Sequence, residues 1–214
     1  MTIRAILFDF DFTLGDSSTG IVECVNAALA GLGLEPADPA AIRATIGLSL
    51  EEILRRLTGI DGAAAPEFRR RFIACADRVM TSHTVLYPWA PALLKRLHGC
   101  GIGTGIVTTK RSYRIAAVLD REDLAAAVDV VVGSDMVAHP KPAPDGLLLA
   151  LNALGLPADT LLYVGDTVTD AEAAAAAGVP FVAVLSGTTP REAFAGWPHR
   201  AVRADASAVI DLLR

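Results

Sequence analysis

Cysteine is scarce in this sequence, and long apolar runs are absent. Its three cysteines, Cys24, Cys75 and Cys100, are widely separated and form no CxxC pair, which argues against a disulfide framework and against a zinc site. The apolar stretch near the N-terminus is cut off by Asp9, too early for a signal peptide, and no run reaches the roughly 18 residues that a membrane span needs. We therefore expect a cytoplasmic protein with no membrane partner.

Long basic runs are also missing. The longest is Arg69–Arg71, and the formal net charge is −5. The basic surface typical of nucleic-acid binding is therefore absent, and no nucleic-acid partner is expected. With 214 residues, of which 52% are hydrophobic and 20% charged, the chain is long enough to bury a sizeable core as one domain, or as one domain that carries an insertion.

Short apolar runs alternate with segments of helical period. Runs rich in β-branched residues predict buried strands at 3–9, 103–109, 128–134, 160–166 and 180–187. Ala/Leu-rich segments predict helices at 90–101, 144–155 and 169–178. The segment 189–193 has the Thr, Pro and Glu of a helix start, and Asp205 can cap a last helix. This alternation predicts an α/β fold with a doubly wound, Rossmann-like parallel sheet.

The region between the first two strands has a different pattern. From about residue 15 to about residue 87 it is helical throughout, with no convincing strand. This predicts a small helical cap, 15–87, inserted into a core formed by 1–14 and 88–214. Ligands of open α/β sheets bind beyond the carboxyl ends of the strands, so such an insertion would stand over the binding crevice. The alternative is that these helices simply pack on the sheet.

Polar clusters follow four of the predicted strands. They are Asp9 with Asp11, Thr108 with Thr109 and Lys110, Lys141, and Asp166 with Asp170. If the strands are parallel, these ends converge, and four carboxylates against Lys141 would raise one another's pKa unless a cation compensates. Mg²⁺ suits such oxygen ligands and readily shares phosphoryl oxygens.

Each cluster also has a simpler explanation when it is taken alone. The Asp pair could be a solvated turn with a helix N-cap, although an EF-hand is excluded because the Gly and Glu positions of that motif hold other residues. Thr108 could be an ordinary strand residue, and Lys141 a surface lysine. Asp166 and Asp170 could be an N-cap and a first-turn acid of a helix. Their occurrence at successive strand ends favours a site.

Taken as a set, these motifs resemble the haloacid dehalogenase superfamily of phosphotransferases. The runs DFDFT, IVTTK, HPKPAPD and GDTVTD occur in the order of that family's motifs and extend over the whole core. The resemblance implies that Asp9 is the nucleophile, forming an aspartyl phosphate, and that Asp11 is the general acid and base. Thr108 and Lys141 would hold phosphoryl oxygens. Further substrate contacts would come from Thr13, Thr109 and Lys110.

The resemblance also implies a Mg²⁺ site and exposes one departure. Asp9, the backbone carbonyl of Asp11 and Asp166 would bind the ion, while Asp170 would hold Lys141 or a metal-bound water. Phe12 stands where family members usually have Gly. If the turn there needs a positive φ, Phe would strain it; if not, the ring could line the entrance.

The predicted cap resembles that of the subgroup that contains phosphoglycolate phosphatases, pyrophosphatases, β-phosphoglucomutases, phosphonatases and dehalogenases. Dehalogenases lack the second Asp, so Asp11 argues against that activity. Phosphonatases need a cap lysine, and 15–87 contains none. The mutases differ in their first motif and in the position of an Arg after the cap glycine, here Gly47. The segment 44–59 looks most like phosphoglycolate phosphatase caps.

The sequence therefore predicts a Mg²⁺-dependent phosphomonoester hydrolase, monomeric or homodimeric, for a small phosphorylated metabolite, with phosphoglycolate as the leading substrate. Pyrophosphate, sugar phosphates, nucleotides and a phosphoglucomutase reaction stay open, as does a phospho-accepting or catalytically quiet regulatory module. Cap arginines could bind a carboxylate or a second phosphate, although most are expected on solvated helix faces. They are Arg43, Arg55, Arg56, Arg69, Arg70, Arg71 and Arg78.

Overall fold

A computed structural model describes residues 2–213. The chain forms two compact units: unit 1 comprises Met1–Gly15 and Leu86–Arg214, and unit 2 comprises Asp16–Val85. Two short strands that the sequence did not predict, β2 (Gly15–Asp16) and β3 (Val85–Leu86), pair with each other, and the boundary between the units runs through both. The chain thus leaves unit 1 once and returns once.

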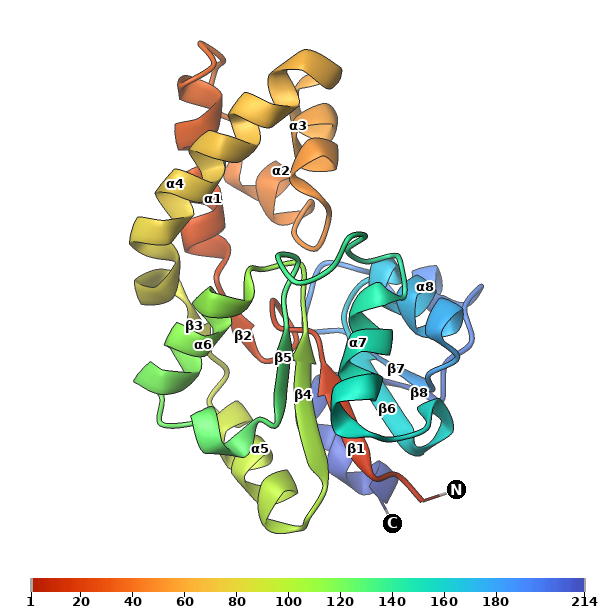
Figure 1. Cartoon of the computed structure of the whole chain (residues 1–214). Helices are drawn as coiled ribbons and strands as arrows, with labels where there is room; N and C mark the ends of the chain where they lie inside the picture. Colours follow the sequence, from red (N-terminus) through yellow and green to blue (C-terminus); the bar gives the residue numbers. More distant parts are fainter. Residues whose placement is uncertain (1, 214) are drawn as a thin grey trace. The chain divides into compact units, whose positions relative to one another are not determined.

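Unit 1 contains a six-stranded sheet with the order β5-β4-β1-β6-β7-β8. Every pair of neighbours is parallel, which confirms the predicted α/β class. The first strand lies inside the sheet, with β4 on one side and β6 on the other (Figure 1). The strands are β1 (Ala5–Phe8), β4 (Gly103–Val107), β5 (Val130–Val132), β6 (Leu161–Gly165), β7 (Phe181–Val184) and β8 (Ala201–Arg203).

Helices cover both faces of this sheet, which explains why its strands read as continuous apolar runs. Ile6, Phe8 and Ile106 pack in one cluster with α5, α6 and the C-terminal 3₁₀ segment. Leu7 and Val107 pack in the other with α7 and α8 (Figure 1). The bounds are α5 (Ala90–Gly99), α6 (Ser112–Arg121), α7 (Asp145–Leu154), α8 (Val168–Ala177) and the C-terminal 3₁₀ segment Ala206–Leu213.

Local signals located most of these elements but not all. Helices α7 and α8 end at Gly155 and Gly178, both left-handed, as a helix C-cap favours. The predicted helix start at 189–193 is wrong, because Arg191–Phe194 forms only a short 3₁₀ turn. Strand β8 escaped prediction because three residues carry too little periodicity. Asp205 does accept a hydrogen bond from the Ser207 N–H, at the start of a 3₁₀ segment.

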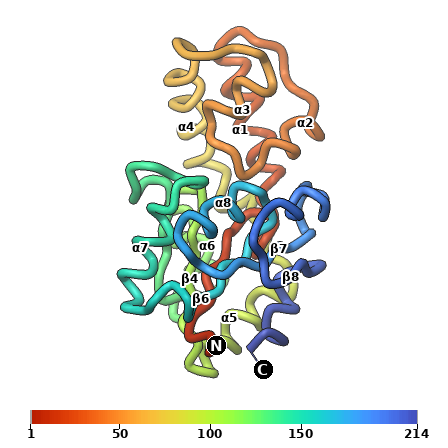
Figure 2. The backbone as a smooth tube through the Cα atoms, turned by 90° about the vertical axis from the view of Figure 1, so that its right-hand side faces the viewer, coloured from red at the N-terminus to blue at the C-terminus, as the bar shows by residue number. Residues whose placement is uncertain are grey.

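Unit 2 consists of four helices. Helices α1 and α4 pack side by side, as Figures 1 and 2 show, and α2 and α3 join them. The helices are α1 (Ser18–Ala30), α2 (Pro39–Arg43), α3 (Leu50–Thr58) and α4 (Ala65–His83). The side chains of Asp38 and Ser49 cap α2 and α3 by accepting hydrogen bonds from backbone N–H groups. Within residues 2–213 no helix combines the length and apolar character that a membrane crossing needs.

The turn after β1 settles the question that Phe12 raised. Phe12 has φ 57°, in the left-handed region, where a β-carbon is unfavourable. Its N–H donates to the Gly15 carbonyl at 2.7 Å, and its own carbonyl accepts a hydrogen bond from the Ser186 hydroxyl. The ring is buried, only 4% exposed, so packing offsets the backbone strain. The positive φ explains why Gly is usual at this position.

Replacing Phe12 by Gly and by Ala separates ring packing from backbone strain. Both variants lose the buried ring, but only Ala keeps a β-carbon in the left-handed region. We expect Phe12→Gly to be more stable than Phe12→Ala by about 1 kcal/mol. Urea unfolding of the two variants would measure this difference. An Ala variant as stable as the Gly variant would show that the turn relaxes to negative φ.

Candidate active site

The register of the parallel strands gathers the predicted site residues at one edge of the sheet. Phe8 pairs with both Ile106 and Val164, so β1, β4 and β6 end at nearly the same level. Asp9 follows β1, and its N–H donates to the Val164 carbonyl at 2.8 Å. Thr108 and Asp166 follow β4 and β6 and are buried, as Asp9 is. Residues far apart in sequence thus meet because their strands end together.

Lys141 reaches this edge from the segment that precedes α7. Its Nζ lies 2.8 Å from Asp9 Oδ1 and 2.6 Å from Asp170 Oδ1, and it donates to the Tyr163 hydroxyl at 2.9 Å. The side chain is 4% exposed, so the explanation of Lys141 as a surface lysine is wrong. The contact with Asp9 is an ion pair whose angles do not meet those of a hydrogen bond. Asp9 Oδ1 accordingly has no hydrogen-bond partner among the described residues.

Asp170 connects the helix α8 to this ion pair. Its Oδ2 accepts hydrogen bonds from the N–H and the hydroxyl of Thr167, at 3.0 and 2.6 Å, forming a capping box. Its Oδ1 accepts from Lys141 and lies 2.8 Å from the Tyr163 hydroxyl. The first-turn explanation of Asp170 is therefore correct but incomplete, since the same carboxylate anchors Lys141. The N-cap is Thr167 rather than Asp166.

A second lysine pairs with the other aspartate of the first motif. Lys110 Nζ lies 2.7 Å from Asp11 Oδ2, and both side chains are about nine-tenths buried. The Lys110 N–H also donates to the Thr108 hydroxyl at 3.2 Å. Thr13 is fully buried and donates to Asp166 Oδ1 at 3.3 Å, while Thr109 is half-buried. No local pattern indicated that Lys110, expected as a substrate contact, would form an ion pair with Asp11.

Burial and crowding shift the protonation of these groups. Burial raises the pKa of Asp9 to about 6, with the charges of Asp170 and Asp11 adding to the rise and Lys141 opposing it. Burial also raises the pKa of Asp166 well above its usual value, and Asp170 and Asp9 add to it. Burial alone would lower the pKa of Lys141, but Asp170 and Asp9 raise it above its usual value. The site therefore opposes full ionisation of its carboxyl groups.

The arrangement suits a divalent cation. One oxygen from each of Asp9, Asp166 and Asp170 lies within 4.8 Å of the others, and all three residues are buried. With Asp11 included, four carboxylates face Lys141 and Lys110, which leaves a formal charge of −2. Asp170 already accepts from Lys141 and from the N–H and hydroxyl of Thr167, and the Tyr163 hydroxyl lies 2.8 Å from its Oδ1. Asp9 and Asp166 are thus better placed to bind a metal ion directly, with Asp170 in support.

Two residues at this edge were missed in the sequence. Gly187, after β7, has no room for a side chain, because a β-carbon there would lie 1.9 Å from Asp166 Oδ2. The Tyr163 hydroxyl reaches the lysine from the middle of β6 and donates to the Val107 carbonyl at 3.0 Å. The available signals were weak: a glycine after a strand, and one phenol within an otherwise aliphatic strand.

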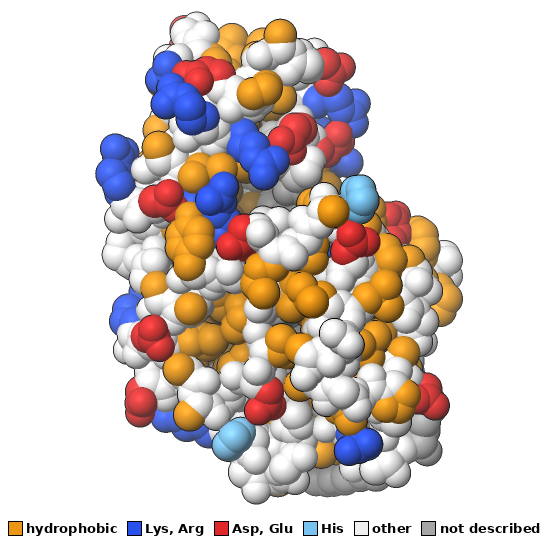
Figure 3. Space-filling model, in the orientation of Figure 1, with side chains coloured by type: hydrophobic (Ala, Val, Ile, Leu, Met, Phe, Trp, Pro, Cys, Tyr) orange, Lys and Arg blue, Asp and Glu red, His pale blue; other side chains and the backbone are white. Residues whose placement is uncertain are grey.

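The arginines of unit 2 are engaged locally. Six of the seven candidates form ion pairs with carboxylates of the same unit, and Figure 3 shows basic and acidic side chains next to each other there. Arg78 is exposed on α4. The paired ones are Arg43 with Asp16, Arg55 and Arg56 with Glu52, Arg69 with Glu51, and Arg70 and Arg71 with Glu67.

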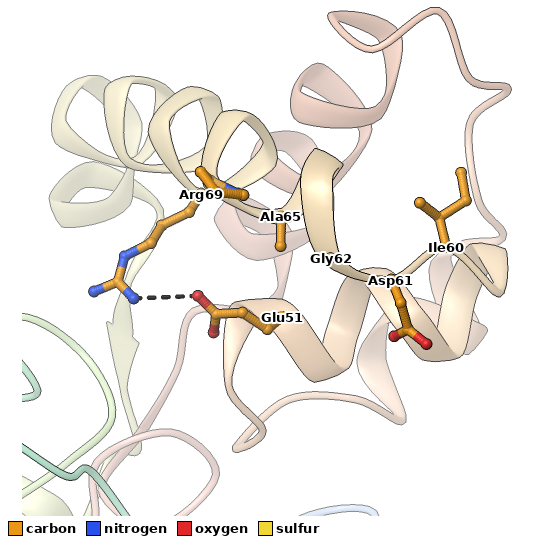
Figure 4. Close-up of a pocket in the computed structure, with 7 residues that line it drawn as sticks. Glu51, Ile60, Asp61, Gly62, Ala65 and Arg69 are labelled. Carbon is orange, nitrogen blue, oxygen red and sulfur yellow. Dashed lines mark hydrogen bonds and ion pairs between the residues drawn. The ribbon is translucent and has the colours of Figure 1, made fainter.

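Unit 2 also has a cavity of about 440 Å³ between α3 and the start of α4. The Arg69–Glu51 ion pair, 3.2 Å long, lies along it, and Asp61 is also in its lining (Figure 4). The remaining lining is small or apolar, and none of the aspartates or lysines of the sheet edge contributes to it. The cavity is therefore distinct from the acidic cluster.

Comparison with known proteins agrees with the motifs and the fold. The family model described as haloacid dehalogenase-like hydrolase matches residues 6–184. The phosphoglycolate phosphatase of Rhodospirillum rubrum is 35% identical over 98% of this chain and 90% of its own length. That of Salmonella typhimurium is 33% identical over 90% of this chain and 85% of its own. A solved Bacteroides fragilis structure, assigned to the haloacid dehalogenase-like hydrolases, is 38% identical over 97% of this chain and 100% of its own, with a TM-score of 0.93.

The chain belongs to the haloacid dehalogenase-like hydrolase family. Its similarity to curated phosphoglycolate phosphatases over most of its length makes it an enzyme of the phosphatase class. The regulatory module without activity, which the sequence left open, is therefore set aside.

Gly187 offers a test of the packing around Asp166. A Gly187→Ala substitution forces the Asp166 carboxylate to move by about 1 Å or more, and we expect phosphatase kcat/KM to fall about hundredfold. The matched control is Gly196→Ala, because a β-carbon at Gly196 meets nothing within 4 Å. Steady-state kinetics and thermal melting of both variants would distinguish a local effect from unfolding. Equal activities in the two variants would show that Asp166 has no positional role.

Proposed function

We propose that this protein is a Mg²⁺-dependent phosphomonoester hydrolase that works through an aspartyl phosphate, with phosphoglycolate as its substrate. The observation that carries the chemistry is the pairing of two buried carboxylates with two different lysines: Asp9 with Lys141, and Asp11 with Lys110. Neighbouring carboxylates in different environments can take different roles, one as nucleophile and the other as acid and base.

In the first half-reaction Asp9 attacks phosphorus. A bond forms between an Asp9 oxygen and phosphorus, the bond from phosphorus to the ester oxygen breaks, and Asp11 gives a proton to the leaving alcohol oxygen. Lys110, 2.7 Å away, stabilises the Asp11 carboxylate that remains. Lys141, against Asp9, offsets negative charge that develops near the nucleophile.

In the second half-reaction water replaces Asp9 on phosphorus. Asp11 takes a proton from the water, the water oxygen bonds to phosphorus, and the bond to Asp9 breaks, releasing inorganic phosphate. The same Asp11 thus serves both halves: it enters the first half protonated, leaves it as the carboxylate that pairs with Lys110, and regains a proton from the water in the second. Thr108, which is buried beside the edge, would donate its hydroxyl proton to a phosphoryl oxygen.

Asp9, Asp166 and the backbone carbonyl of Asp11 would hold the Mg²⁺. When bound, the ion neutralises the excess negative charge and draws electron density from the phosphoryl oxygens. Its fit is supported by the formal charge of −2 and the oxygen-only donor set. Asp170 stays with Lys141, because it already accepts hydrogen bonds from Lys141 and Thr167 and is packed against the Tyr163 hydroxyl.

Phosphoglycolate is proposed from the curated relatives, which carry that substrate in their names at 33% to 35% identity. The arginines of unit 2 do not add to this proposal, since six of them already pair with carboxylates.

A substrate panel tests the proposal. Phosphate release from phosphoglycolate, pyrophosphate, sugar phosphates, nucleotides and a phosphonate would be measured with Mg²⁺ and with excess EDTA. We expect phosphoglycolate to have the highest kcat/KM, and EDTA to abolish turnover in a way that added Mg²⁺ restores. A different preferred phosphoester would overturn the substrate, and full activity in EDTA would overturn the metal.

Conservative variants test the two aspartates. Asp9→Asn removes the nucleophile, so turnover should fall by about three orders of magnitude or more. Asp11→Asn removes the acid and base, and a fall of about 10²- to 10⁴-fold is expected. Single-turnover assays with ³²P-labelled substrate should show protein-bound label for the wild type and none for Asp9→Asn. Labelling of the Asp9→Asn protein would contradict the assignment of the nucleophile.

A further inference from the structure

Tyr163 stands out among the buried polar groups, because neither the motifs nor the reaction proposed above use it. It lies in β6, is fully buried, and projects into the cluster packed against α7 and α8. Its hydroxyl is within 3.0 Å of three groups that belong to different parts of unit 1: Lys141 Nζ, Asp170 Oδ1 and the Val107 carbonyl.

A count of the hydrogen-bond donors and acceptors around Lys141 shows what this hydroxyl contributes. An ammonium group has three N–H donors, and Lys141 has three oxygens within 2.9 Å: those of Asp9, Asp170 and Tyr163. A phenol has one proton and can also accept. The Tyr163 hydroxyl therefore accepts from Lys141 and sends its own proton to Asp170 or to the Val107 carbonyl. The buried lysine thus donates two hydrogen bonds, to Asp170 and to Tyr163, and meets Asp9 as an ion pair.

The geometry also restricts where the ammonium can go. Asp9 and Asp170 both attract Lys141, but only Asp170 accepts a hydrogen bond from it, and a buried ammonium without a second acceptor is costly. The hydroxyl supplies that acceptor, and because its ring is enclosed by the sheet core it cannot follow the lysine. Its single proton then ties the lysine either to β4, through the Val107 carbonyl, or to α8, through Asp170.

We propose that Tyr163 is a positioning residue that holds the Lys141 ammonium against Asp9. The proposal rests on the function proposed above, in which Lys141 offsets charge at the nucleophile. Without the hydroxyl, the ammonium turns toward the vacated Val107 carbonyl, and its alignment with Asp9 is lost. The effect belongs to the chemical step, so it lowers kcat and leaves substrate affinity nearly unchanged.

The variant Tyr163→Phe tests this, because it removes one oxygen and keeps the ring. We expect kcat to fall about ten- to hundredfold, as for loss of a hydrogen bond to a charged group, with KM changed by less than about threefold. Tyr113→Phe is the matched control: it removes a hydroxyl from a tyrosine that is 44% exposed on α6, and it should keep wild-type kinetics. A kcat for Tyr163→Phe within about twofold of wild type would overturn the proposal.

A double-mutant cycle distinguishes positioning through Lys141 from a general structural effect. In the Lys141→Ala background, Tyr163→Phe should lower kcat by less than about twofold further, because the group it positions is gone. If the two substitutions multiply, Tyr163 acts independently of Lys141 and the proposal is wrong.

A crystal structure of the Tyr163→Phe protein separates this inference from the proposed function. We expect the Lys141 ammonium to have moved out of ion-pair contact with Asp9, beyond 4 Å. An unchanged contact would refute the positioning role whatever the substrate turns out to be. If the wild type hydrolysed none of the panel, the proposed function would fail, and the position of Lys141 would still decide the inference.

Discussion

Repulsion among four buried carboxylates is the constraint on which the rest of unit 1 depends. Parallel strands that end at one level bring Asp9, Asp11, Asp166 and Asp170 together, away from water that would screen them. Two lysines supply partners from separate segments, one after β4 and one before α7. Because removing one partner of a buried pair leaves an uncompensated charge, costing about 3 to 5 kcal/mol, each lysine supports the fold as well as the site.

Helix capping and chemistry share the same carboxylate. Asp170 closes the capping box at the start of α8 and anchors Lys141 with its other oxygen. The orientation of α8 and the position of the lysine are thus set together. Tyr163 extends this link to β4 through the Val107 carbonyl. The ammonium beside the nucleophile is therefore held by a strand, a helix and a buried ring rather than by its own flexible side chain.

Unit 2 shows how a count of charged residues can mislead. Its arginines look like anion ligands in the sequence, yet six of them pair with Asp or Glu nearby, several at i,i+3 or i,i+4 spacing on α3 and α4. Exposed pairs of this kind contribute little to stability, because water and salt screen them, and they support the helices that carry them.

Local sequence patterns were enough to predict the α/β class and the strands and helices with strong periodicity. They also identified the aspartates and the lysine that follow the strand ends as candidate site residues. These features depend on short-range patterns that a chain carries wherever it folds. Tertiary structure decided the ion pair between Asp11 and Lys110, the hydroxyl of Tyr163 beside Lys141, and the absence of room at Gly187. Each of these depends on strand register and helix placement between residues that are 21 to 99 positions apart in the sequence, which no local pattern records.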